Sequence, residues 1–389
     1  MSTDGAPGTT VPADLPLLDH HCHGVVTDDL GDEQFALLLT ESGTRAPAYR
    51  SPLDSPVGLA VRRWCAPLLD LEPGVPFPEY LDRRRALGGT EVARRLLRAT
   101  GTTEYLVDTG HTADPITSPA GLAELAGAPA RTVVRVERVA EAVLDDPAAE
   151  GVPYLDALER ALRAATTDAV GLKTIVAYRG GLALPPAPGS AEVERRAHAH
   201  RAARRTRLDD RLLLRAGLDV AARVGAELGL PLQVHCGWGD VDLDLHLADP
   251  VRLTPWLRDV AVPAGTQVCL LHCYPYHRQA AFLASVLPTV WFDVGLALPY
   301  LGPSSRTVLA EALELAPFGT QLYSSDAYGL AELYLLAARQ FRAGLDAVLG
   351  RWVRDGDCTA EDALRIASGL ASGNARNAYA RVPRAGGTP

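Results

Sequence analysis

The chain has 389 residues, of which 47% are hydrophobic and 22% charged, and its net charge is −9. This length suits one large domain with a sizeable core, and the composition is that of an ordinary globular protein. An acidic chain without a basic tail gives no reason to expect a nucleic-acid partner. Its six cysteines are too sparse for a disulfide scaffold and suit a reducing compartment.

Neither end of the chain has the features of a targeting segment. Residues 1–14 lack the basic start and apolar run of a signal peptide, and no stretch has the length and apolar character of a membrane span. We therefore expect a cytoplasmic protein without a membrane partner. Residues 1–14 and 383–389 are predicted to be disordered tails, which leaves 15–382 as a single domain.

The stretch Asp19-His20-His21-Cys22-His23-Gly24 follows the apolar residues 15–18, which have the make-up of a short buried strand. Side chains alternate between the two faces of a strand, so His21 and His23 are expected on one side and Cys22 on the other. Two imidazoles spaced in this way at a strand end can bind one metal ion. Residues 30–100 follow with many prolines and with helical spacing at 79–99. They predict a mainly helical insertion, either a lid over the active site or peripheral packing.

From residue 101 onward, strand and helix patterns alternate. Strands are predicted at 103–108, 132–137, 169–177, 231–236, 267–273, 289–294 and 320–326, and helices at 139–144, 155–165, 212–228, 280–286 and near 360–380. With the first strand this makes eight, the pattern of an α/β fold of the (β/α)8 TIM-barrel type. An open doubly wound sheet would show the same alternation. The arginine-rich segment 190–215 favours a solvated, ion-paired helix face over an anion site.

Functional side chains of a barrel lie at the carboxyl ends of its strands. His235 and His272 end the fifth and sixth predicted strands, Asp326 ends the eighth, and Lys173 lies within the fourth. Imidazoles with one carboxylate form a ligand set that Zn²⁺ prefers and that Mn²⁺ or Fe²⁺ accepts. We therefore predict a site for a divalent metal, with zinc the first candidate.

Three cysteines lie one residue from these histidines. Cys22, Cys236 and Cys273 each neighbour a candidate ligand along a predicted strand. Alternation places them on the opposite face, under the surrounding helices. We predict that they belong to the core and do not bind the metal.

The ordered set Asp19-x-His21-x-His23, Lys173, His235, His272 and Asp326 resembles the amidohydrolase superfamily of metal-dependent barrels. The wider strings at 171–179, 234–240, 271–277 and 323–328 are similar to the amidohydrolase-2 branch. Within it they are close to the amidohydrolase portion of FluG/nodulin-type proteins, which are fused to a glutamine synthetase-like domain. The resemblance covers residues 15–380. No glutamine synthetase-like part follows, so a stand-alone version is expected.

The resemblance implies roles for these residues. His21, His23, His235 and Asp326 match the metal ligands, and Asp326 also matches the general base and acid. His272 is either a ligand to a second ion or a catalytic hydrogen-bonding group. Lys173 is either carboxylated and bridges two metals, or an ammonium that holds a substrate carboxylate; a purely structural ion pair is the third reading. One or two ions per chain are both compatible with this set.

A second group of residues is expected to bind substrate or shape the pocket. Arg135 and Glu137 end the third predicted strand on one face, and Arg179 follows the fourth; arginine suits bidentate capture of a carboxylate, and ordinary ion pairing is the alternative. Glu137 would be a bridging ligand in some related barrels. The loops after the ligand strands supply Trp238, Asp240, Tyr274, Tyr276, His277 and Tyr328. Asp293 is expected to orient a ligand histidine.

The leading function is that of a metal-dependent hydrolase that cleaves a C–N bond of a small carboxylate-bearing amide. By analogy with the fused proteins, a γ-glutamyl amide is the suggested substrate. A metal-dependent non-oxidative decarboxylase of an aromatic or unsaturated acid is the alternative. A catalytically inactive barrel that acts as a binding protein is a second one. Proteins that the sequence resembles are often dimers, so a homo-oligomer is expected.

Overall fold

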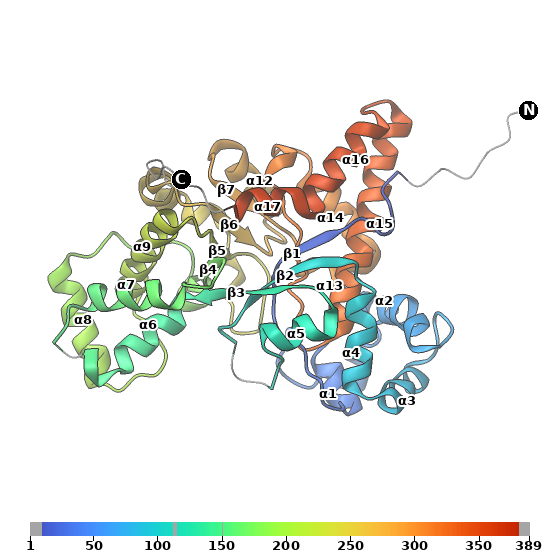
Figure 1. The fold of residues 1–389 in the computed structure, drawn as a ribbon, viewed down its shortest axis with the longest axis horizontal. Helices are drawn as coiled ribbons and strands as arrows, with labels where there is room; N and C mark the ends of the chain where they lie inside the picture. The colour runs from blue at the N-terminus through green and yellow to red at the C-terminus, as the bar shows by residue number, and fades with distance from the viewer. Residues whose placement is uncertain (1–9, 112–114, 150, 381–389) are drawn as a thin grey trace, which may run out of the picture.

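A computed structural model, which describes residues 10–111, 115–149 and 151–380, shows an α/β fold around one parallel sheet (Figure 1). Its seven strands are neighbours in the order of the chain. They are β1 (Leu17–Cys22), β2 (Thr102–Asp108), β3 (Ala130–Arg135), β4 (Gly171–Thr174), β5 (Leu232–His235), β6 (Val268–Leu271) and β7 (Val290–Phe292). Parallel strands in chain order confirm the α/β class, and the curled sheet agrees with a barrel and not with an open doubly wound sheet.

The predicted eighth strand is an irregular segment that lies between β7 and β1. Gln321 forms an isolated parallel bridge with Phe292. On the other side, the Asp326 N–H donates to the carbonyl of His21 at 3.0 Å. The segment therefore occupies the eighth position of the barrel and curls the sheet back toward β1, but with few ladder bonds. The positive φ of Asp326, 47°, departs from strand geometry at its end.

Helices surround the sheet (Figure 1). The α-helices are α1 (Asp32–Leu37), α2 (Pro56–Ala60), α3 (Phe77–Leu87), α4 (Gly89–Arg98), α5 (Pro119–Ala126), α6 (Val136–Asp145), α7 (Tyr154–Ala165), α8 (Ser190–Ala202), α9 (Arg211–Leu228), α10 (Thr254–Trp256), α11 (Val262–Ala264), α12 (His277–Val286), α13 (Ala297–Leu301), α14 (Ser305–Ala312), α15 (Ala331–Asp355), α16 (Ala360–Ser368) and α17 (Asn374–Ala378). The chain specifies their ends locally: Asp210 caps α9 by accepting from two backbone N–H groups, and Gly229 ends it in the left-handed region.

The segment between β1 and β2 is helical, as predicted for residues 30–100. It contains α1 to α4, and α4 packs beside α15. A buried ion pair joins the two parts: Glu332 of α15 accepts from Arg84 Nε and from the Tyr80 hydroxyl, both at 3.0 Å. Its role as a lid stays a prediction, although its residues 37–43 contribute to the cavity described below.

Three predicted boundaries need correction. β3 ends at Arg135 and α6 starts at Val136, so Glu137 lies in the first turn of a helix and not on the strand. β4 is shorter than predicted, and Arg179 lies in a 3-10 turn, η5 (Val176–Arg179). The predicted N-terminal tail also ends before residue 14: Val11 is buried, and its N–H donates to the Asp346 carboxylate. Residues 1–9 and 381–389 lie outside the described part.

The interior of the barrel is closed by α17 at the end opposite to the site. Leu18, Leu106 and Leu271 point inward there and pack against Ala375 and Ala378 of α17. Two larger clusters pack the outer faces of the strands against the helices. Cys236 and Cys273 belong to one and Cys22 to the other, so the cysteines are core residues as predicted.

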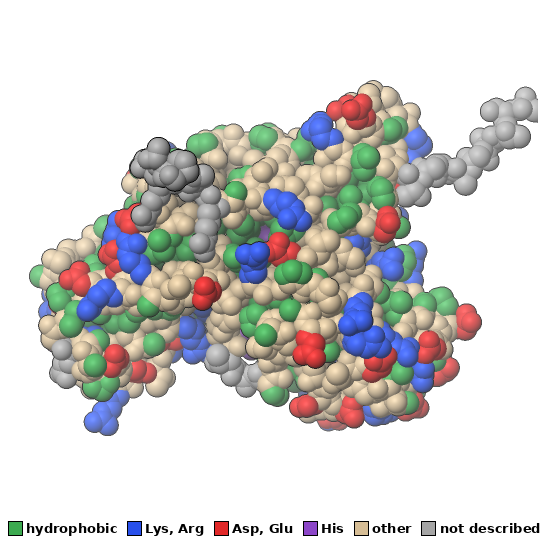
Figure 2. Space-filling view, viewed as in Figure 1, with side chains coloured by type: hydrophobic (Ala, Val, Ile, Leu, Met, Phe, Trp, Pro, Cys, Tyr) green, Lys and Arg blue, Asp and Glu red, His purple; other side chains and the backbone are tan. Residues whose placement is uncertain are grey.

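The surface carries charges of both signs. Figure 2 shows Lys/Arg and Asp/Glu side chains interspersed over the region of α3 and α4. The face of α8 is also ion-paired, with Arg195 and Arg196 both bound to Glu192, as predicted for the arginine-rich segment. Among the described helices, we find none with the length and apolar character needed to span a membrane.

Candidate metal centre

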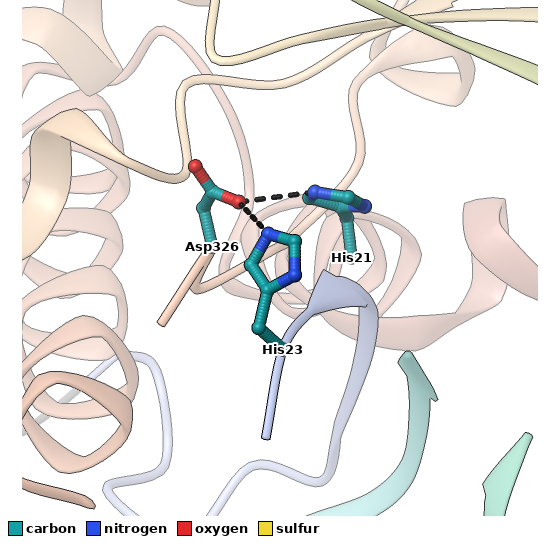
Figure 3. Close-up of side chains that lie close together, drawn as sticks. All are labelled: His21, His23 and Asp326. Carbon is teal, nitrogen blue, oxygen red and sulfur yellow. Dashed lines mark ion pairs between the residues drawn. The ribbon is translucent and has the colours of Figure 1, made fainter. Parts of the chain in front are cut away.

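His21, His23 and Asp326 point toward one another at the carboxyl ends of β1 and of the eighth segment (Figure 3). Asp326 Oδ1 lies 3.0 Å from His21 Nε2 and 3.5 Å from His23 Nε2. One ligand atom from each residue falls within 4.8 Å of the others. A divalent ion bound at about 2.0–2.2 Å from each atom fits such a group.

His235 and His272 complete the group from β5 and from the residue after β6. Their ring centroids are 4.8 Å apart, and His272 Nδ1 lies 3.3 Å from Asp326 Oδ2. Three buried atoms, His235 Nε2, His272 Nδ1 and Asp326 Oδ1, have no hydrogen-bond partner among the described residues. Buried polar atoms are seldom left unsatisfied, so these donor atoms fit a bound cation.

Burial keeps these imidazoles in the form that binds a metal. It lowers the pKa of His21 to about 4, with the neighbouring Lys173 adding to the effect. Burial also lowers the pKa of His235 and His272 well below the ordinary value. Burial alone would raise the pKa of Asp326, but its contacts with the histidines outweigh it and favour the carboxylate. Neutral imidazoles and an ionised carboxylate can therefore coexist near neutral pH.

A hydrogen-bond network beneath the site orients its ligands. Gln233 Oε1 contacts His21 Nδ1 at 2.8 Å, and Gln233 Nε2 donates to the Tyr379 hydroxyl at 2.7 Å. The same hydroxyl contacts His20 Nδ1, and His20 Nε2 contacts Asp293 Oδ2, both at 2.9 Å. Partners of this kind fix the ring orientation of a ligand histidine.

Asp293 acts on His272 through the backbone. Its Oδ1 accepts from the His272 N–H at 3.1 Å and from the Ser324 hydroxyl at 3.0 Å. Asp293 therefore contacts His272 through the backbone and not through the ring, and its role in orienting a ligand histidine stays a prediction. His272 has a φ of 62°, a conformation that a non-glycine residue adopts only where its surroundings impose it.

Lys173 lies next to the candidate metal ligands. Its Nζ is 3.1 Å from His21 Nε2, and the side chain is buried. Burial lowers its pKa, which neighbouring Asp108 and Asp326 partly oppose. A lysine with a lowered pKa can offer a free amine to CO₂, serve as a cation toward a substrate or pair with a neighbouring carboxylate, and these three roles stay predictions.

A cavity of about 500 Å³ opens onto these residues. Arg135 and Arg179 line it, as predicted for substrate contacts. Arg135 is tied to Asp108 at 2.5 Å, whereas Arg179 has buried Nε and Nη1 atoms without a hydrogen-bond partner in the described structure. Arg179 Nη2 approaches Glu141 at 3.4 Å. Arg179 therefore has donors to spare for an anionic group, and Arg135 is mainly engaged.

Two predicted substrate residues lie away from the cavity. Glu137 is buried and accepts from the Thr174 hydroxyl and the Ile175 N–H, and His277 contacts Glu311 at 2.7 Å. Neither lines the cavity. Trp238 and Tyr274 do not line it either but face an adjoining one.

The fold also brings to the site several residues that the sequence pattern did not indicate. They include Glu41, His111, Tyr178, Arg207 and Tyr300 in the cavity wall and Gln233 beneath it. Gln233 precedes His235 by two residues on β5, so alternation could have placed it on the same face. Glu41 and Tyr300 carried no such signal, because a turn after α1 and the helix α13, far apart in the chain, supply them.

Fold and site together define a barrel protein with a candidate divalent-metal centre. No family model matches the chain. Protein fluG of Emericella nidulans is 31% identical over 280 residues, which are 64% of this chain and 32% of fluG. The matched region is thus about a third of that relative's length.

Solved structures give matches along nearly the whole chain. A protein from Lactobacillus casei ATCC 334, described as a "putative metal-dependent hydrolase", superposes with a TM-score of 0.80 at 29% identity, covering 94% of this chain and 95% of that one. A glucuronate isomerase from Caulobacter crescentus has a TM-score of 0.66 at 16% identity and covers 98% and 94%. This second match shows the fold alone.

Proposed function

We propose that the protein is a metal-dependent hydrolase that cleaves the C–N bond of a small carboxylate-bearing amide, with γ-glutamyl amides as the first substrates to test. One observation carries the proposal: His21, His23 and Asp326 converge on one point, and unpartnered buried atoms of His235 and His272 face the same group. The similarity to the Lactobacillus casei protein supports the same class.

The chain offers a complete set of ligands. His21, His23, His235 and Asp326 would hold the ion, with zinc the best match to the donor set. When bound, the metal supplies an acidified water and polarises the substrate carbonyl. Gln233 holds the His21 ring so that its Nε2 faces the site.

Asp326 is placed to move the proton. Its Oδ1 has no hydrogen-bond partner, and its Oδ2 lies 3.3 Å from His272 Nδ1. As a carboxylate it can accept a proton from water and return it to the leaving nitrogen. His272 can donate to the substrate oxygen or stabilise the protonated Asp326.

Recognition of the substrate carboxylate falls to Arg179. Its buried Nε and Nη1 have no hydrogen-bond partner in the described structure, and its side chain lines the cavity together with Lys173. Nε and Nη1 lie on opposite edges of the guanidinium, so each can donate one charge-assisted hydrogen bond to a carboxylate. This is the feature that favours a carboxylate-bearing substrate.

The test combines metal analysis with product analysis. Protein purified without chelator is assayed for metal per chain, and then for hydrolysis of γ-glutamyl amides in ¹⁸O-labelled water. Release of the amine with ¹⁸O in the new carboxylate is the expected result, and Asp326→Asn should lower the rate by about a thousand-fold. Two ions per chain would support a carboxylated Lys173, and one ion an unmodified lysine.

The opposing results are equally clear. Release of CO₂ from an aromatic or unsaturated acid, without solvent oxygen in the product, would replace the hydrolase with the decarboxylase. Failure to bind Zn²⁺ or Mn²⁺ at all would overturn the metal centre. Metal binding without turnover of any tested substrate would favour the inactive binding protein.

A further inference from the structure

A second cavity of about 1160 Å³ adjoins the one at the metal centre. Leu37, Thr40, Glu41 and Tyr300 line both, so the two cavities meet at these residues. None of the candidate metal ligands lines the second cavity. It is therefore a separate space with a common border, and the Tyr300 hydroxyl, which donates to Glu41 at 2.8 Å, lies at that border.

One side of the second cavity is apolar and largely aromatic. Trp238 and Tyr300 pack edge to face there with ring centroids 5.0 Å apart. The side also includes Leu245, Tyr274, Pro275 and Leu301. Leu37 and Leu245 stay 39% and 38% exposed. Apolar surface that remains in contact with water next to an active site gains free energy when a ligand covers it.

The loops that line this cavity are the same loops that follow the candidate ligands. Trp238 comes three residues after His235, and Tyr274 comes two residues after His272. The Trp238 N–H donates to the Tyr274 carbonyl at 2.7 Å, which ties the two loops together. A group bound between them would lie at a fixed position relative to the metal centre.

The two cavities lie toward different strands of the barrel mouth. Lys173 lies on β4 and Arg179 follows it, whereas the second cavity is built from the loops after β5, β6 and β7 and from residues 32–57 after β1. The eighth segment lies between β7 and β1, so β4 is on the opposite side of the barrel from it. A molecule whose carboxylate binds Arg179 and whose carbonyl reaches Asp326 would therefore extend its other end toward Glu41 and Tyr300.

We propose that the second cavity is a subsite for an apolar or aromatic group on the amine side of the substrate. The proposal rests on the proposed function for the position of the amide, and it narrows the substrate to amides of aryl or bulky apolar amines. The smaller cavity takes the carboxylate and the reacting carbonyl. The larger one takes the leaving group.

Hydroxamates test the subsite without turnover, because they bind a metal whether or not an amide is cleaved. Calorimetry on the zinc-loaded protein would compare acetohydroxamic acid with N-phenylacetohydroxamic acid, whose phenyl group is attached to the nitrogen and so lies on the amine side. Burial of the phenyl group should tighten binding by roughly ten-fold or more. Trp238→Ala should remove most of this gain and leave the affinity for acetohydroxamic acid unchanged. Leu245→Asn, at the exposed rim, provides a second variant that keeps the fold.

Phe282→Ala is the matched control, since Phe282 is a 47% exposed aromatic residue on α12 that lines neither cavity. The phenyl group should increase the affinity of Phe282→Ala by the same factor as that of the wild type. In parallel, the hydrolysis of γ-glutamylanilide and γ-glutamylethylamide is compared. The KM of the wild type should be lower for the anilide, and Trp238→Ala should abolish this difference.

The outcomes separate the two proposals. A phenyl gain that depends on Trp238 without hydrolysis of either amide would support the subsite and overturn the hydrolase. Hydrolysis without a phenyl gain, or with one that Trp238→Ala does not reduce, would overturn the subsite and leave the hydrolase. If neither hydroxamate binds, the metal centre and the subsite both fall.

Discussion

Individual residues of the site are held by partners as much as by their own chemistry. His21 contacts Gln233 Oε1 through Nδ1, while its Nε2 lies 3.0 Å from Asp326 Oδ1 and faces the candidate metal site. Gln233 in turn donates to the His20 carbonyl at 2.7 Å. An amide oxygen that accepts from Nδ1 fixes the tautomer whose Nε2 lone pair can bind a metal.

Gln233→Leu should therefore weaken metal binding. The leucine cannot accept from His21, and the affinity should fall by roughly 10- to 100-fold while the fold is retained. Competition with a chromophoric chelator measures it. Gln340→Leu is the control, because Gln340 is also buried but donates to the Pro299 carbonyl, which is not a candidate ligand. Equal losses in both variants would contradict the role of Gln233.

Glu41 gives a pH dependence at the cavity border. Burial and the neighbouring Asp240 raise its pKa to about 8. The folded state therefore keeps this proton at pH values where the unfolded chain has lost it, and stability falls as pH rises from the ordinary value of 4.5 toward 8. Glu41→Gln cannot ionise and escapes this loss.

Urea unfolding at about pH 5 and about pH 8 measures this difference. Between the two pH values, the free energy of unfolding of Glu41→Gln should rise by roughly 1–2 kcal/mol relative to that of the wild type. The effect is of this modest size because Glu41 is partly exposed. Glu72→Gln, an exposed carboxyl in the same helical segment, should show no such change. Parallel pH profiles of the wild type and Glu41→Gln would argue against the raised pKa.

At the scale of elements, the eighth segment is held by side chains as well as by backbone bonds to its neighbours. Asp19 of β1 accepts from the Ser325 N–H at 2.9 Å and from its hydroxyl at 2.5 Å. Ser324 is tied to Asp293 in the same way. These bonds place Asp326, the next residue, although its φ is unfavourable for a strand.

Ser325→Ala should lower both stability and metal affinity. It leaves the buried Asp19 carboxyl with one partner fewer, which costs about 1–3 kcal/mol, and it frees the residue before Asp326. Urea unfolding and a zinc titration measure the two effects. Ser285→Ala, an exposed serine on α12, should change neither by more than about 0.5 kcal/mol. A stable Ser325→Ala variant with unchanged zinc affinity would show that the hydrogen bonds from Ser325 to Asp19 are not needed to position Asp326.

At the scale of the molecule, the helical segment α1–α4 is attached to the barrel through α15. Figure 1 shows α4 lying along α15, and the Arg84–Glu332 pair joins α3 to α15 with almost no exposure. A buried cation that loses its partner is costly, so Glu332→Gln should destabilise the protein by about 3–5 kcal/mol.

The matched control is Glu314→Gln at the surface pair with Arg278, whose side chains are 51% and 58% exposed. It should cost less than about 1 kcal/mol. Urea unfolding compares the two variants, and hydrogen exchange should show the loss for Glu332→Gln centred on α3 and α4. A small, uniform effect would mean that apolar packing alone attaches the segment.

The sequence by itself determined the parallel α/β fold and the set of residues that meets at the site. Alternation along β1 separates His21 and His23 from Cys22, and strand ends carry His235, His272 and Asp326. Both signals are local in the chain, because hydrophobic pattern and residue type decide which side of an element faces the core. Glu137 shows the limit: the boundary between β3 and α6 fell two residues before it.

Only the tertiary structure decided the partners. Tyr379 meets His20 across 359 residues, and Glu41 meets Tyr300 across 259. Periodicity predicts which face of an element is buried but not which distant side chain it contacts. The orienting network under the metal site and the border between the two cavities depend on such contacts, because packing of the whole chain sets them.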